Sequence, residues 1–408
     1  MSTAELYASS LSSPIDSVRL TTKAVVDAEA TKPRASLSDS AAFTTASPTF
    51  SNSTGDPILD PLLAHVWLDE QRLRDELSAH PALYSQSALP PTWAQWYHYC
   101  DMSSEAGLQQ TAQYVFVLDA LNFCFWPLAE YEYAQLAGSL KLTLVTQPDS
   151  FAAARLAKLT TAELQQWLQP PTDKQEGALI AHAEQRASST DSGAEIDSRH
   201  LPHRSPQPDS AGVLIPLLHS RTRALNELGV FLLNHHSGLA LNLLRFASLA
   251  SSASTFVAHI LAYLPAFRDH CVHPATGQQV FFYKRAQILT ADLYGAFRST
   301  PLCQWQDKDR LTCFADYRLP QLLASLGVLV YSDALRQTVA QKREIEAGSS
   351  VEVSIRAHTV VAVELMVSAM REKGSALLPL QLDWILWERG ESMLSQLPPH
   401  HRTRTIYY

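Results

Sequence analysis

The longest regular pattern in this 408-residue chain is a helical one. From Val213 to about residue 265, apolar residues recur every three or four positions, and Gly238 and Pro265 punctuate the pattern. This spacing places the apolar side chains on one face of an α-helix. Residues 151–168 and 281–294 show similar spacing. The sequence therefore predicts a mainly α-helical protein with a few short strands.

Three other segments are assigned from composition and alternation. Residues 114–127 form the most apolar stretch, and their length and aromatic content fit either a strand or a buried helix. Residues 351–357 alternate apolar and polar side chains, which predicts one of the few strands. A helix is expected to follow from about Thr359 to Met370. Residues 61–68 predict a further helix.

Composition excludes several classes of protein. The net charge is −8 and no basic block occurs, which argues against a nucleic-acid backbone as the main ligand. No run approaches 18 apolar residues, so no transmembrane helix and no membrane partner are expected. The N-terminal residues lack the basic and apolar regions of a secretory signal. We therefore expect a cytoplasmic protein, with the nucleus as an alternative.

The cysteine and histidine residues do not predict a metal site. The 5 cysteines contain no C-x-x-C pair, a pattern typical of free thiols in a reducing compartment. The pair His235 and His236 has no third ligand nearby in the sequence. We therefore expect neither a metal nor an organic cofactor.

Low-complexity segments divide the chain. Residues 31–58 are rich in Ser, Thr, Pro and Ala, which indicates a flexible surface segment. Residues 171–211 contain few large apolar side chains and many Ser, Pro and charged residues. The predicted organisation is an N-terminal segment over 1–58, partly flexible, and a single domain over 59–408 that is interrupted by an insertion at 171–211.

An aspartate lies among aromatic residues in Thr312–Gln321, which reads TCFADYRLPQ. Pro320 opens an apolar run, and proline is tolerated in the first turn of a helix. Asp316 is therefore expected just ahead of a helix N-terminus, where the helix dipole favours negative charge. Two interpretations stay open: an ordinary capping residue, which is the commoner role, or a functional carboxylate beside Phe314 and Tyr317.

Other polar residues stand in apolar or aromatic surroundings. Asp119 and Asn122 lie inside the apolar stretch 114–127, where buried polar groups need partners, so they are structural ties or ligand contacts. Lys284 begins a predicted helix among aromatic residues, where a solvated lysine is the commoner case. His98 lies in a cluster of tryptophans and tyrosines, and a satisfied core histidine is the commoner case there.

Four blocks of the chain together resemble the queuosine salvage protein family, the queuosine 5′-phosphate N-glycosylases. The blocks are Leu118–Trp126 (LDALNFCFW), Phe282–Leu289 (FYKRAQIL), Phe314–Gln321 (FADYRLPQ) and His401–Tyr408 (HRTRTIYY). The resemblance implies a single helical unit similar to helical DNA glycosylases. It implies hydrolysis of the N-glycosidic bond of queuosine 5′-monophosphate, which releases queuine for tRNA modification, without a metal or organic cofactor. The partner is then a small molecule, with no direct tRNA binding, and we expect a monomer.

The resemblance also assigns site residues. It implies catalytic roles for Asp316, Lys284 and Glu388, and substrate-binding roles for His98, Phe314, Tyr317, Asp383, Trp384 and Asn122. The family histidine that follows a tryptophan matches His98, although an ungapped match places Cys100 there. Relatives carry Asp where this chain has Glu388, which is one methylene longer. Asp383 and Glu388 are about 140° apart on a helix, so they need not face one pocket.

The substrate chemistry explains why carboxylates are candidates. Queuine is a 7-deazaguanine, so its ring has no N7 to protonate, and more of the barrier falls to an oxocarbenium-like ribosyl centre. A carboxylate near C1′ stabilises that charge and orients water, and another carboxylate can accept the N–H donors of the base. Which of Asp316, Asp383 and Glu388 does which stays open. Lys284 holds the phosphate or a ribose oxygen, or keeps Asp316 ionised.

Two alternatives belong to other classes. The chain could be a non-catalytic binder of a modified nucleotide or base, which loss of Asp316 or Lys284 would have favoured. A helical scaffold whose aromatic residues are only core is the second alternative, and it predicts no thermal shift on ligand addition.

Overall fold

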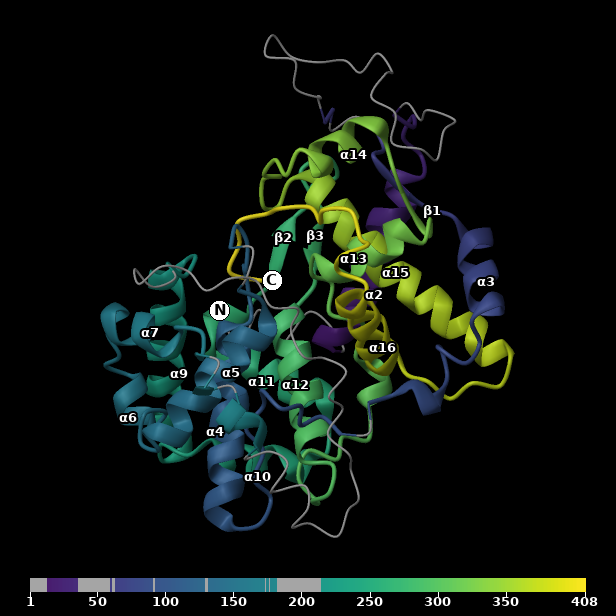
Figure 1. The fold of residues 1–408 in the computed structure, drawn as a ribbon. Coiled ribbons are helices and arrows are strands. Elements are labelled where there is room, and N and C mark those ends of the chain that lie inside the picture. Colours follow the sequence, from purple (N-terminus) through teal and green to yellow (C-terminus); the bar gives the residue numbers. More distant parts are fainter. Residues whose placement is uncertain are drawn as a thin grey trace.

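The structure is a computed structural model, and it describes residues 13–35, 59–60, 63–90, 92–128, 131–172, 174–175, 177–181 and 214–408. Within these residues the chain is mainly helical, as the sequence predicts (Figure 1). Its elements are α2 (Pro14–Glu29), β1 (Val66–Leu68), α3 (Glu70–Ala79), η1 (Gln86–Ala88), α4 (Glu105–Leu121), α5 (Tyr133–Thr146), α6 (Ala153–Leu156), α7 (Thr161–Trp167), α9 (Leu218–His236), α10 (Ala240–Ala250), α11 (Ala253–Tyr263), η3 (Pro265–Phe267), β2 (His270–Val272), β3 (Gln279–Phe281), α12 (Lys284–Ala296), η4 (Lys308–Arg310), α13 (Arg318–Ser325), β4 (Leu329–Tyr331), α14 (Asp333–Ala340), α15 (Ser350–Glu372) and α16 (Pro379–Ser392).

The first group of helices surrounds α4. Figure 1 shows α4 beside α5, α9 and α10 in one half of the molecule, and α4 also packs on α12. The ambiguous apolar stretch is therefore a buried helix, which the Ser104 hydroxyl caps by accepting a hydrogen bond from the Gly107 N–H. Because α4 has neighbours on all sides, its residues from Thr111 to Leu121 are buried without helical periodicity.

The second group of helices surrounds α15, and here one prediction is wrong. Residues 351–357 are not a strand; they form the first turns of α15. The alternation misleads because α15 is buried almost all round, so that its polar residues Glu352, Ser354 and Arg356 are buried as well as its apolar ones. The sequence does contain a helix signal here, the capping residue Ser349. Its hydroxyl accepts a hydrogen bond from the Glu352 N–H.

Among the described residues, α15 is also the helix that is long and apolar enough to cross a membrane, judged by length and composition alone. However, 78% of its most apolar window is buried inside the protein. It packs against α2, α13, α16 and the strand β1, so it is the central core helix of this half.

The strands form two small antiparallel sheets. β1 pairs with β4, with Val66 opposite Tyr331, and β2 pairs with β3, with His270 opposite Phe281. The prediction of a helix over 61–68 is therefore wrong for Val66–Leu68. That strand is fixed by its distant partner β4, which local sequence does not reveal.

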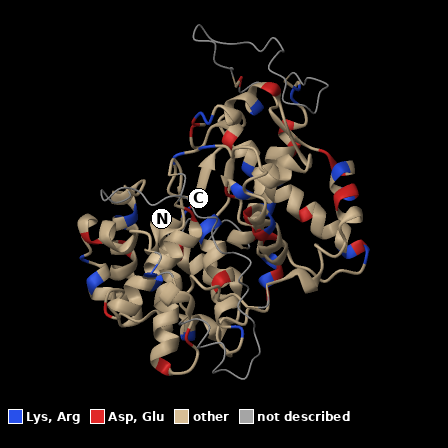
Figure 2. Cartoon of the chain, viewed as in Figure 1, with Lys and Arg blue, Asp and Glu red and all other residues tan. Residues whose placement is uncertain are grey.

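The ends of the low-complexity segments pack on this body. α2 lies against α15, with Ile15 and Val18 buried, so this helix of the predicted segment 1–58 belongs to the core. Leu179 is also buried, so the first residues of the predicted insertion pack on the protein. The rest of the predicted flexible segments, 36–58 and 182–211, lies outside the described residues. Figure 2 marks acidic and basic residues along the ribbon, and the two kinds are interspersed over the described residues.

Candidate active site

A cavity of about 200 Å³ lies where α16 faces the ends of α4, α12 and α13. A single water needs on the order of 10–15 Å³ measured in this way, so the cavity is sized for a ligand. Every site residue that the sequence predicts lines it. These residues are His98, Asn122, Lys284, Phe314, Asp316, Tyr317, Asp383, Trp384 and Glu388.

Lys284 enters the cavity from the first position of α12. The helix starts there because Tyr283 is in the left-handed region (φ 51) and the Asp269 carboxylate accepts the Lys284 N–H at 3.1 Å. The side chain is buried, and its Nζ donates to the Asn122 carbonyl at 3.4 Å. Burial lowers the pKa of Lys284, an effect that the charges of Asp316 and Asp119 oppose. The expectation of a solvated lysine is wrong, since this cation is held inside a carboxylate-rich wall.

Asp316 is both a cap and a cavity residue. Its Oδ1 accepts hydrogen bonds from the Arg318 N–H at 2.8 Å and the Leu319 N–H at 3.2 Å, at the start of α13. The side chain is half-buried and lines the cavity. Two N–H donors and a helix N-terminus stabilise a negative charge, so the two interpretations that the sequence left open are compatible.

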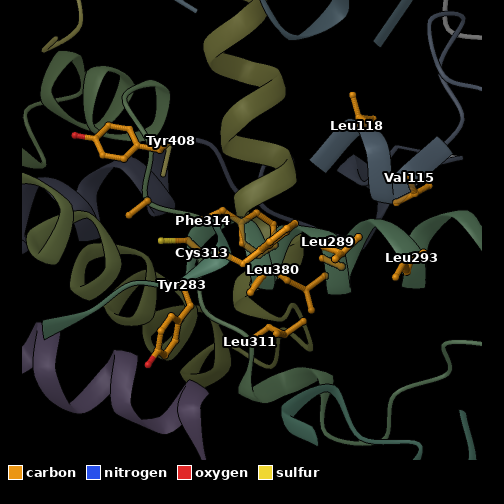
Figure 3. Packing of buried hydrophobic residues seen from close by; sticks show 14 of the residues in the cluster. Val115, Leu118, Tyr283, Leu289, Leu293, Leu311, Cys313, Phe314, Leu380 and Tyr408 are labelled. Carbon is orange, nitrogen blue, oxygen red and sulfur yellow. The ribbon is translucent and has the colours of Figure 1, made fainter. Parts of the chain in front are cut away.

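Asp383 lies deeper than Asp316. It is 4% exposed, and its Oδ1 accepts the backbone N–H of Phe314 at 2.8 Å. Burial raises the pKa of Asp383 well above its usual range, and the nearby charge of Asp316 adds to that shift. Phe314 lies beside Leu380 and Cys313 in the hydrophobic cluster (Figure 3). The Phe314 backbone therefore links the buried aspartate to the core.

The helix α16 supplies a wall of tryptophans and carboxylates. Trp384, Trp387 and Glu388 are half-buried and line the cavity together with Asp383. The rotation around the helix axis between Asp383 and Glu388 therefore does not place them in different pockets, because the cavity extends around this side of α16. Trp387 also meets the Tyr133 ring edge-on at 5.6 Å.

His98 lines the cavity, whereas Cys100 is not among the residues that line it. The His98 ring stacks on Trp93 with 4.1 Å between ring centroids. Its Nε2 lies 2.9 Å from the Tyr133 hydroxyl and its Nδ1 lies 2.9 Å from the Trp93 carbonyl. Burial lowers the pKa of His98 to about 3, so the ring is neutral at physiological pH. His98 therefore holds Trp93 and Tyr133 in place at the wall of the cavity.

The sequence did not single out several residues of the wall as site residues. These are Trp93, Glu132, Tyr133, Asp292, Arg298, Arg318, Trp387 and Glu391. Asp292 is a carboxylate in an apolar helical segment, as Asp119 is, so the same sequence pattern could have identified it. The others reach the cavity only through tertiary packing. Gly295 packs closely against Trp93 in this region, since a Cβ at position 295 would lie 2.9 Å from Trp93 Cδ1.

Arg318 and Tyr317 organise the rim of the cavity. The Arg318 Nε donates to Glu391 at 2.6 Å, and its guanidinium lies 3.7 Å from Glu132. The Tyr317 hydroxyl donates to the same Glu132 at 3.0 Å, and its ring stacks on His400 at 4.2 Å. The charge of Arg318 is thus already matched by protein carboxylates.

The described residues contain no group of three or more His, Cys, Asp or Glu side chains arranged to hold a metal ion. The expectation that no cofactor is needed stays a prediction.

Comparisons with known proteins identify the family of this chain. The family model described as queuosine salvage protein matches residues 101–196 and 194–408. A relative from Dictyostelium discoideum, named queuosine 5′-phosphate N-glycosylase/hydrolase, is 36% identical over 352 residues, which is 85% of this chain and 95% of the relative. Relatives with the same name from Sphaerobacter thermophilus and Mus musculus are 35% and 31% identical, over 84% and 77% of this chain and 93% and 87% of their own lengths. This chain belongs to the queuosine salvage protein family.

Proposed function

We propose that this protein hydrolyses the N-glycosidic bond of queuosine 5′-monophosphate, and that queuine and ribose 5-phosphate are the products. The observation that carries the proposal is the cavity itself. It gathers Asn122, Lys284 and Asp316 from three of the sequence blocks that resemble the family, and adds the carboxylates of α16. The named activity of the relatives supports the same reaction.

Asp316 and Asp383 lie in different environments, and the difference suggests a different role for each. Asp316 is half-buried and keeps one oxygen on the backbone N–H groups at the start of α13, where the helix dipole is positive. An ionised carboxylate suits the ribosyl centre, where positive charge develops as the bond to the base breaks. Asp383 is buried, and its raised pKa suits hydrogen bonding to a neutral base. We therefore place Asp316 near C1′ and Asp383 at the base.

The reaction balances with these residues alone. The water oxygen forms a bond to C1′ while the bond from C1′ to N9 breaks. The electron pair of the broken bond leaves with the base. Asp316 takes a proton from the water as it attacks. N9 of the leaving ring takes that proton from Asp316, which restores the carboxylate, and queuine leaves with a neutral deazaguanine ring. The buried ammonium of Lys284 contributes a positive charge beside Asp316 in the same wall.

The aromatic residues hold the base between flat surfaces. Trp384 and Trp387 line the same wall as Asp383, and an aromatic face packs well on a deazaguanine ring. The Tyr133 hydroxyl, which His98 positions, offers a polar group to the edge of the base.

Incubation with queuosine 5′-monophosphate tests the function directly, with mass spectrometry detecting free queuine and ribose 5-phosphate. Release of both products in equal amounts is expected. Tight binding of the nucleotide without release of queuine would refute the reaction and leave a binding protein.

A further inference from the structure

The substrate of the proposed function, on which this inference rests, carries a positive charge on its base. In queuosine the carbon that replaces N7 carries a methylene group, and a secondary amine joins this methylene to a cyclopentene-diol. A dialkyl amine of this kind is protonated at neutral pH. A site that recognises queuine must therefore place an ammonium group, which costs free energy in a buried cavity unless a negative group meets it.

The described wall of the cavity has an excess of carboxylates in its buried part. Asp292, Asp316, Asp383 and Glu388 face it, whereas Lys284 is the buried cation. The charge of Arg318 is matched by Glu391 and Glu132, and Arg298 is exposed at the margin. A phosphate-bearing ligand would be repelled by this interior unless its buried end were cationic. The charge distribution thus fits a ligand that is anionic at one end and cationic at the other.

Asp292 is the carboxylate that the proposed chemistry leaves without a role. It is 4% exposed, lies on α12 and lines the cavity with Trp93 and Gly295. It follows Lys284 by eight residues, or about 12 Å along the helix. The Trp93 indole hydrogen-bonds to its carboxylate, and Lys284 is its cationic neighbour. Asp292 therefore sits in the wall, away from the catalytic end and beside an aromatic ring.

Asp119 lies close to Asp292, on the helix α4 that packs against α12. Asp119 is fully buried, with Asn122 and Lys284 among its polar neighbours. Burial raises the pKa of Asp119 well above its usual range, and the charge of Asp292 adds to that effect. Burial likewise raises the pKa of Asp292, against the opposing effects of Trp93 and Lys284. Lys284 and Arg285 are cationic neighbours of Asp119, and Lys284 is the cationic neighbour of Asp292. Asp292 lines the cavity, so a ligand ammonium can meet its carboxyl group directly.

We propose that Asp292, with the buried Asp119 behind it, accepts the protonated secondary amine of the substrate. The pair then selects deazaguanine nucleotides that carry a cationic substituent at the 7-position over those with a neutral substituent or none. This assigns to Asp292 a role in specificity that is separate from bond cleavage.

Binding of free bases tests the assignment without turnover. Dissociation constants are measured for queuine and for 7-deazaguanine, which lacks the amine, by isothermal titration calorimetry at constant ionic strength. Asp292→Asn is expected to weaken queuine binding by ~10²-fold and to leave 7-deazaguanine binding within about threefold. Asp292→Glu, which keeps the charge, should recover most of the preference. Asp27→Asn removes an exposed charge on α2, outside the residues that line this cavity, and should change neither constant.

A second measurement uses the wild-type protein alone, so that it does not depend on the folding of a variant. It should bind 7-aminomethyl-7-deazaguanine at least ~10-fold more tightly than 7-cyano-7-deazaguanine, which is of similar size and uncharged. Equal affinity for these two bases overturns the proposal. So does an Asp292→Asn variant that weakens both bases equally, or a preference that Glu388→Gln abolishes and Asp292→Asn leaves intact.

Turnover of queuosine 5′-monophosphate is followed in the same wild-type samples. A preserved preference for cationic bases without turnover would refute the proposed reaction and leave the Asp292 assignment standing. Turnover without any preference for cationic bases would support the proposed reaction and refute the Asp292 assignment.

Discussion

At the scale of single residues, Asp316 shows how one side chain serves structure and chemistry together. One carboxylate oxygen holds the first N–H groups of α13, and the side chain lines the cavity. The cap fixes the rotamer of the side chain, so the charge is in place before a substrate arrives. Preorganisation of this kind is the usual source of electrostatic stabilisation in enzymes.

Asp316→Asn separates the two roles. Asparagine caps a helix about as well as aspartate, so thermal unfolding should shift little. The charge is lost, however, and kcat/KM for queuosine 5′-monophosphate should fall by at least ~10²-fold, or about 2.7 kcal/mol of transition-state stabilisation. A variant that keeps more than a tenth of the activity would mean that Asp316 is a cap only and that Asp383 or Glu388 acts at C1′.

Lys284→Met tests the buried cation. Methionine fills similar space, but the carboxylates around it lose their nearest positive charge, so their pKa values should rise. We expect kcat/KM to fall by at least ~10²-fold, with the remaining activity displaced toward higher pH. Lys23→Met, on the exposed face of α2, is the control and should match the wild type. An unchanged pH profile in Lys284→Met would exclude the electrostatic role.

The sequence reached the residues of this site unevenly. Asp316 and Lys284 were found because they stand in distinctive blocks, and His98 because it follows a tryptophan. Tyr133 and Trp387 carry no local signal that separates them from core aromatics. They reach the wall because α5 and α16 meet there, and such a meeting depends on contacts between segments far apart in the chain.

At the scale of elements, periodicity worked where a helix has an exposed face and failed where it has none. α9, α10 and α11 show helical spacing and were predicted. The first turns of α15 are buried on all sides, so their alternation of apolar and polar residues marks no exposed face, yet it predicts a strand. The capping residue Ser349 is the more reliable signal for this helix.

The helix α15 also ties together the segments that carry the site. Arg356 donates to both carboxylate oxygens of Asp269, at 2.9 and 2.5 Å, and to the Ala315 carbonyl at 3.1 Å. Asp269 caps α12 at Lys284, and Ala315 precedes Asp316. A single guanidinium therefore fixes the starts of α12 and α13 relative to each other.

Arg356→Met should be strongly destabilising, because it leaves Asp269 buried without its partner. The expected loss is about 3–5 kcal/mol in the free energy of unfolding, measured by urea denaturation. Arg245→Met provides the comparison, since its ion pair with Glu105 is half-exposed and should contribute less than about 1 kcal/mol. Similar losses in the two variants would show that Arg356 does not hold these segments.

At the scale of the whole molecule, the cavity draws on residues from Trp93 to Glu388, so it exists only when both groups of helices are assembled. The ionisation of its buried groups therefore contributes to the free energy of unfolding of the whole protein. Burial raises the pKa of Asp292 to about 7 from an ordinary value of 3.8. Between these pH values the folded protein holds a proton that the unfolded chain releases, so this residue makes stability fall as pH rises.

Asp292→Asn removes that dependence. The stability of the variant relative to the wild type should increase by on the order of 2 kcal/mol between pH 5 and pH 8. Urea unfolding at several pH values measures it, and parallel stability curves for the two proteins would contradict the burial of an uncompensated carboxyl group.

The 5′-phosphate is expected to matter although it lies far from the bond that breaks. Binding energy from a remote group can be used to lower the barrier at the reacting centre. We predict that kcat/KM for queuosine 5′-monophosphate exceeds that for the nucleoside queuosine by at least ~10²-fold. Steady-state assays of both compounds decide this, and equal values would show that the phosphate has no role.

The close packing of Gly295 against Trp93 has an evolutionary consequence. Any side chain at position 295 would push the indole that forms one wall of the cavity, so neither position can change freely while the other stays as it is. Substitutions that alter which bases the cavity admits should therefore be epistatic, harmful one at a time and tolerated in pairs. A lineage that acquires a new base preference is expected to show both positions changed together.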